Sequence, residues 1–153
     1  MNFLRRVFNK FSGAVSDPVL GSMVREDDYW TGQIGWEHSP RPFSLTVHRA
    51  NEVPAEADRN TFQALSRNYP ALRTDLQGAL YQLWIAARDN AKSQSPDFGG
   101  SLDLWSRVTL QGVGIHPDGH ANLTYGLEDS TDFEGAFIVA VRGLDVSAVE
   151  YVE

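Results

Sequence analysis

The side chains best suited to chemistry lie in one short stretch, where His116, Asp118 and His120 fall within five residues. Imidazole nitrogens and carboxylate oxygens are ligands for zinc and other divalent ions. Further carboxylates follow, at Glu128, Asp129, Asp132 and Glu134. The spacing matches neither a helical histidine pair nor a calcium loop. Because Asp118 and Gly119 also favour a tight turn, two hypotheses stay open: a hairpin turn, or a small metal-dependent hydrolase using the His116–Glu134 region.

A second polar group surrounds His48. If residues 29–37 and 43–49 are strands, His48 shares a face with Ser44, Thr46, Gln33 and Glu37. A general base could lie there, but the pattern is also typical of the solvated side of a sheet. The chain has no G-x-S-x-G elbow, P-loop or dinucleotide fingerprint. We therefore predict no catalytic residue and no cofactor.

The beginning of the chain carries apolar residues at helical spacing, with basic residues off that stripe. The apolar positions include Phe3 and Phe8, and Arg5, Arg6 and Lys10 are the basic ones. We predict an amphipathic helix over residues 1–13, which can dock on its own domain, on a partner protein or on an anionic membrane. It is the one segment where we expect any membrane contact, since no apolar run approaches the roughly 20 residues of a span.

Composition narrows the function classes. The chain has 153 residues, a formal net charge of −7 and no cysteine. This length fits a single domain, 1–153. The lack of cysteine excludes disulfides and thiolate catalysis, and suits a reducing compartment, so we expect a cytoplasmic protein. The negative charge argues against nucleic acid as a partner, and it suits a basic protein partner as well as plain solubility.

Hydrophobic periodicity predicts an α+β fold, with strands at both ends of the chain and helices between them. Alternation of period two predicts strands at 20–25, 29–37 and 43–49. Gly32 then lies on the inward face and leaves room for close packing of a neighbour. In the last third, Leu110 and Val113 fall on opposite parities, which predicts a bulge at Gln111-Gly112. The last third is also predicted to contain a turn at 116–120, a buried strand at 137–141 and an edge strand at 146–152.

The middle of the chain is predicted to be a helix pair. One helix begins near Asp58 and ends at Tyr69, since Pro70 cannot continue it but suits the first turn of the next. The second helix carries a long apolar stripe that includes Leu80 and Trp84, and a loop over 93–101 ends it. The expected architecture is a mainly antiparallel sheet of six to seven strands, formed by two β-meanders around the helix pair, with one long helix packed on the sheet.

Several short motifs resemble a group of small bacterial domains of unknown function, over about residues 17–142. They are Asp17-Pro18-Val19-Leu20-Gly21, Trp30-Thr31-Gly32 in a strand, Asp118-Gly119, and Asp132-Phe133-Glu134-Gly135 before an apolar strand. The resemblance implies a role like that of immunity proteins, which neutralise toxins. It brings no catalytic residues.

The function predicted is that of a non-enzymatic protein-binding module, immunity-protein-like or regulatory. Four Trp, five Tyr and eight Phe supply the aromatic residues that protein interfaces favour. The candidate contacts are Glu128, Asp129, Asp132 and Glu134 in the acidic loop, followed by Phe3 and Phe8.

Overall fold

Eight strands form one sheet whose spatial order follows the sequence, from β1 to β8. The computed structural model describes residues 13–49, 52–90, 99–127 and 135–152. The strands are β1 (Ala14–Asp17), β2 (Gly21–Glu26), β3 (Tyr29–Ile34), β4 (Phe43–Val47), β5 (Val108–Ile115), β6 (Ala121–Leu127), β7 (Ala136–Arg142) and β8 (Asp145–Val152). Neighbouring strands are antiparallel, except that β4 and β5 are parallel. The α+β class and the mainly antiparallel sheet are confirmed, but the predicted six to seven strands are too few.

The local features of the sheet agree with the alternation in the sequence. A side chain at Gly32 would place its Cβ 2.3 Å from the carbonyl oxygen of Ser22 on β2, so the predicted close approach is confirmed. The register of β5 against β6 shifts between Leu110 and Gly112, which confirms the bulge. Leu110 and Val113 are both buried, and the extra residue is what allows both to face the core.

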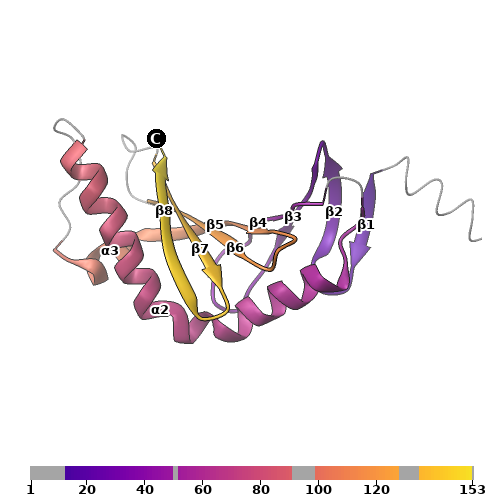
Figure 1. The fold of residues 1–153 in the computed structure, drawn as a ribbon, viewed down its shortest axis with the longest axis horizontal. Coiled ribbons are helices and arrows are strands. Elements are labelled where there is room, and N and C mark those ends of the chain that lie inside the picture. Colours follow the sequence, from indigo (N-terminus) through magenta and orange to yellow (C-terminus); the bar gives the residue numbers. More distant parts are fainter. Residues whose placement is uncertain (1–12, 50–51, 91–98, 128–134, 153) are drawn as a thin grey trace, which may run out of the picture.

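The predicted helix pair is wrong, because one helix, α2 (Glu56–Asn90), continues through Pro70. Proline lacks an amide hydrogen, so the Ser66 carbonyl four residues earlier loses its helical donor. The Nε2 atom of His38 lies 2.9 Å from that carbonyl oxygen. A carbonyl can only accept, so this nitrogen carries the hydrogen. Trp36 Nε1 donates to the Ser66 hydroxyl at 2.7 Å. The helix continues and bends near its middle (Figure 1).

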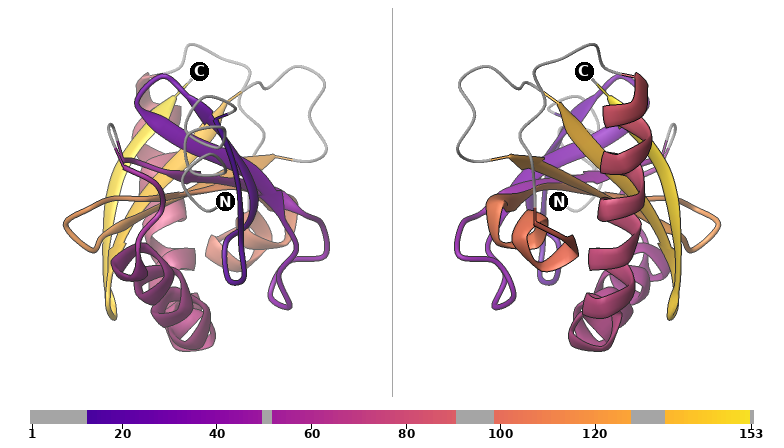
Figure 2. Two further views of the ribbon diagram at one scale, coloured as in Figure 1. Left: turned by 90° about the vertical axis from the view of Figure 1, so that its right-hand side faces the viewer. Right: turned by 90° about the vertical axis from the view of Figure 1, so that its left-hand side faces the viewer.

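The core lies between the sheet and the two helices. Leu80 is 0% and Trp84 1% exposed, which confirms both as core residues. A short helix, α3 (Ser101–Arg107), follows the predicted loop over 93–101 where no helix is predicted, and it buries Leu104. Figure 2 shows α2 and α3 on the same side of the sheet. Among the described residues, no helix covers the other face.

Candidate functional site

The uncovered face of the sheet is hollowed into an open groove of about 490 Å³. Short polar side chains from β3, β4 and β6 line it, at Thr31, Ser44, Thr46, Asn122 and Thr124. A second hollow of about 450 Å³ continues along β3 to β6 and shares Ser44 and Gln111 with the first. We call the two hollows together the groove. Its lining is rich in hydroxyls and amides that can both donate and accept hydrogen bonds.

Two glycines on β5 form part of the floor of the groove. Gly112 and Gly114 are two residues apart and thus face the same side of the strand. A Cβ at Gly112 would meet nothing closer than 3.5 Å, the carbonyl oxygen of Ser44. The fold's own packing therefore leaves room for a Cβ there. Glycine weakens a strand interior and often marks a site that a ligand or another backbone approaches closely.

The bulge places Gln111 at the junction of the two hollows. Its side chain lies over Gly126 of β6, where a Cβ would come within 2.0 Å of the Gln111 amide nitrogen. Bulges commonly re-aim a side chain beside a functional site. The bulge and Gly126 together hold an amide group where both hollows meet.

Three histidines stack at one end of the groove. The ring centroids of His48 and His116 are 4.2 Å apart with an interplanar angle of 8°, and those of His116 and His120 are 4.0 Å apart at 7°. His48 lines the groove. The side-chain amide of Asn122 lies 3.0 Å from His116 Nε2. We call His48, His116 and His120 the histidine stack.

The parallel pairing of β4 and β5 explains why the stack forms. Val47 is in register with Ile115, and the amide of His48 donates to the Ile115 carbonyl at 2.9 Å. The next residues, His48 and His116, therefore leave the sheet side by side at the same edge. The turn at 116–120 then returns the chain and adds His120.

Burial lowers the pKa of His48, and the nearby His120 lowers it further. Burial likewise lowers the pKa of His116, as do His48 and His120, while Asp118 opposes them. Both rings are therefore neutral at neutral pH. The backbone amide of His120 is the main cause that lowers the pKa of Asp118 to about 2. The Asp118 carboxylate contacts His120 Nδ1 and receives Arg142 Nη2 at 3.0 Å.

The stack does not present a metal site. A ligating nitrogen points its lone pair in the plane of its ring, and zinc lies about 2.0–2.1 Å from that nitrogen. Rings in parallel planes about 4 Å apart do not direct their lone pairs to one point. Within the part of the chain that the structure describes, no group of three or more His, Asp or Glu side chains could hold a metal ion. The metal candidates His116, Asp118 and His120 are close together, but not as ligands.

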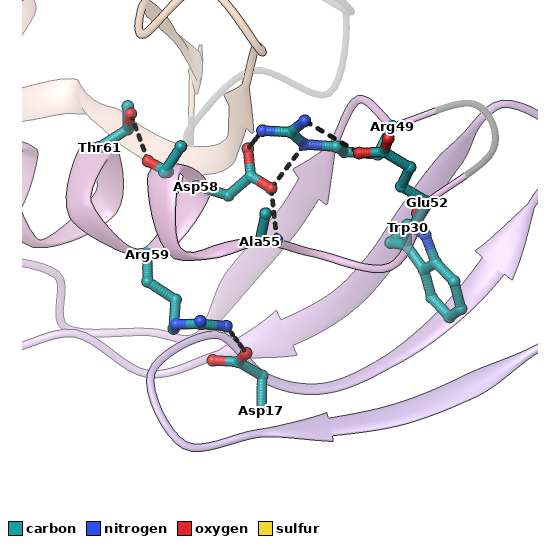
Figure 3. Close-up of polar contacts among 9 residues, drawn as sticks. Asp17, Trp30, Arg49, Glu52, Ala55, Asp58, Arg59 and Thr61 are labelled. Atoms are coloured by element: carbon teal, nitrogen blue, oxygen red, sulfur yellow. Dashed lines mark hydrogen bonds and ion pairs between the residues drawn. The ribbon is translucent and has the colours of Figure 1, made fainter. Parts of the chain in front are cut away.

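Ionic and hydrogen-bonded contacts fix the chain that follows β4, and Figure 3 shows those between Arg49, Glu52 and Asp58. Arg49 follows His48 and binds Asp58 of α2 through two contacts, Nε–Oδ2 at 2.9 Å and Nη2–Oδ1 at 3.2 Å. Asp58 is 1% exposed and also accepts from the Ala55 amide at 2.8 Å. This contact caps the first turn of α2, as a capping box does. The backbone that carries His48 is thereby held to the helix.

A second ion pair ties the edge of the sheet to the same helix. Arg59 Nη1 lies 2.9 Å from Asp17 Oδ2 at the end of β1 (Figure 3). The amides of Val19 and Leu20 donate to the other carboxylate oxygen at 2.9 Å. These amides and Arg59 lower the pKa of Asp17, although burial acts in the opposite direction. Asp17 is therefore a structural residue of the turn between β1 and β2.

The predicted site residues fall into three groups. Ser44, Thr46 and His48 line the groove and Gln33 lines its second hollow, whereas Glu37 lines neither and lies 3.5 Å from His38. The following partner-binding candidates lie outside the described residues: Glu128, Asp129, Asp132, Glu134, Phe3 and Phe8. Residues 1–12 of the helix predicted for 1–13 lie outside them as well.

Several groove residues do not figure among the candidates of the sequence analysis: Gln111, Gly112, Gly114, Asn122 and Thr124. The signal that could find them is the combination of the bulge with two glycines at alternate positions of one strand. Those positions belong to the face opposite the core, so they lie together on the open side of the sheet.

Comparison with family models, with curated proteins and with solved structures finds no match to this chain. No helix in the described part of the chain is long and apolar enough to cross a membrane.

Proposed function

We propose that this chain is a non-enzymatic protein-binding module, immunity-protein-like or regulatory, and that it binds its partner in the groove on the uncovered face of the sheet. The observation that carries the proposal is Gly112. The fold has space for a Cβ at this position, yet the residue is glycine, which weakens the interior of a strand. Because no side chain projects from Gly112, a partner segment can lie directly against the β5 backbone.

The lining of the groove supports a polypeptide as the occupant. Thr31, Thr46, Thr124 and Asn122 offer both donors and acceptors at short reach, which suits the alternating amides and carbonyls of an extended chain. Glu26 gives the first hollow a carboxylate and Arg41 lines the second, while the whole chain has a net charge of −7. A partner with basic side chains is therefore favoured by charge complementarity, which acts mainly on the association rate.

The metal-dependent hydrolase remains the alternative function for the His116–Glu134 region. The parallel stacking of its histidines does not favour it, and the acidic residues 128–134 lie outside the described part of the chain.

The test is capture of a partner from a lysate of the native host, with variants that separate the groove from the rest of the surface. Thr46→Arg places a long side chain in the groove. Ser147→Arg makes the same charge change at an exposed position of β8. We expect the protein with Ser147→Arg to bind the partner as the unmodified chain does, and Thr46→Arg to weaken binding about tenfold or more.

Thermal unfolding of both variants checks that they are folded. If Thr46→Arg is folded and binds the captured partner with unchanged affinity, the groove is not the binding surface.

A further inference from the structure

The histidine stack joins two parts of the chain that are distant in sequence. His48 follows β4, whereas His116 and His120 flank the turn between β5 and β6. Two backbone hydrogen bonds close that turn, from His116 N to the His120 carbonyl at 3.0 Å and from Gly119 N to the His116 carbonyl at 3.1 Å. We propose that the histidine stack is an acid-sensitive clasp, which holds this turn against the end of β4 while the rings of His48 and His116 are neutral and releases it when these two rings take up protons.

The contacts of the rings are close enough for protonation to matter. Centroid separations of 4.0 and 4.2 Å put neighbouring imidazoles in van der Waals contact. Neutral rings attract each other at this distance, whereas two imidazolium ions repel. A Cβ at Gly114 would lie 3.4 Å from His48 Nε2, an ordinary van der Waals distance, so the His48 ring lies against β5 at this position.

The charges around the stack do not balance protons added to His48 and His116. From the turn, Asp118 contacts His120, but the same carboxylate already binds Arg142 of β7. From β3, the ring of Tyr29 lies 6.2 Å from that of His48 and its hydroxyl donates to Glu26 of β2.

Arg49, the residue after His48, forms ion pairs with Asp58 and Glu52. Asn122 of β6 is neutral and contacts His116. The carboxylate in contact with the stack, that of Asp118, is therefore already paired with Arg142.

The direction of the effect follows from proton linkage. The pKa values of His48 and His116 are lowered from 6.5, first of all by burial. The clasped form therefore binds fewer protons than the open form, so the clasp is fully stable above pH 6.5 and loses stability as the pH falls below it. Each ring that is protonated only in the open form multiplies the opening constant by about ten per pH unit, and two rings by about 100.

Amide hydrogen exchange of His116 and Gly119 measures this opening in the whole chain. After correction for the intrinsic rate, we expect the opening constant to rise as the pH falls from 6.5 towards the lowered pKa values of the clasped form, with a limiting slope of about 100-fold per pH unit for two rings. His116→Phe keeps a flat ring in the stack without a titrating nitrogen, and should reduce the slope to about tenfold per unit or less. His38→Phe, the same change on the helix-covered side, should leave the slope unchanged.

The proposal is overturned if the opening constant of the unmodified chain does not change with pH, or if the two variants show the same slope. Neither outcome depends on whether the groove binds a protein.

Discussion

The hydrogen bond from His38 to the Ser66 carbonyl is the contact that lets α2 continue through Pro70. Replacing His38 with Phe removes the donor and keeps an aromatic ring. The ring contacts of His38 with Tyr69 and Trp36, at centroid distances of 5.3 and 5.0 Å, are then largely preserved. The substitution thus isolates the hydrogen bond from the packing around it.

The magnitude follows from the burial of the carbonyl that loses its donor. A fully buried acceptor left without a partner costs about 1–3 kcal/mol. Ser66 is half-buried, so water can partly replace the donor, and we expect His38→Phe to destabilise the fold by about 1–2 kcal/mol. Adding Pro70→Ala restores an amide hydrogen four residues after Ser66, which can donate to the same carbonyl. In that background, His38→Phe should cost less than about 0.5 kcal/mol.

Urea unfolding of the four proteins measures the cycle: the unmodified chain, the two single variants and the double variant. Measurement at pH 7.5 keeps histidine titration out of the comparison. The midpoint should fall in His38→Phe with an unchanged slope, and the coupling free energy between the two positions should be about 1 kcal/mol. Costs of His38→Phe that agree within about 0.3 kcal/mol in the two backgrounds would refute the idea that this histidine replaces the missing helical donor.

Two further stability predictions can be checked by the same unfolding measurements. Asp58→Ala removes the cap of α2 and leaves the guanidinium of Arg49 with the exposed carboxylate of Glu52 alone. We expect a loss of about 2–4 kcal/mol, below the value for a fully buried pair because the Arg49 side chain is 17% exposed. Combining it with Arg49→Met should cost less than the sum of the single changes, and additivity would contradict the pairing. Leu80→Ala should cost about 2–5 kcal/mol, whereas Leu102→Ala, at a 69% exposed position, should cost less than about 0.5 kcal/mol.

Features that depend on local alternation could be predicted from the sequence. The bulge is the clearest case, since Leu110 and Val113 cannot both reach the core without an extra residue between them. The burial of Leu80 and Trp84 follows in the same way from the apolar stripe of the helix. In each case the residues that determine the bulge or the buried stripe lie within a few positions of one another.

Features that depend on residues distant in the sequence, or on very short segments, could not be predicted from the sequence. The sequence near Pro70 predicts the end of a helix because the donor that compensates for proline, His38, comes from a loop 32 positions earlier. The strand Ala14–Asp17 has four residues and the helix Ser101–Arg107 has seven, and segments of this length are too short for a period to be recognised.

The candidate site follows from one property of the topology, the parallel pair at the centre of an otherwise antiparallel sheet. Parallel neighbours need a long crossover, and here α2 and α3 form it along one face. That arrangement covers one side of the sheet and leaves the other open for the groove. It also brings the carboxyl ends of β4 and β5 to the same edge, where His48 meets His116. An antiparallel pairing of these strands would direct the two histidines to opposite edges. His48 and His116 are 68 positions apart in the sequence, and the parallel pairing that the crossover allows brings them into contact.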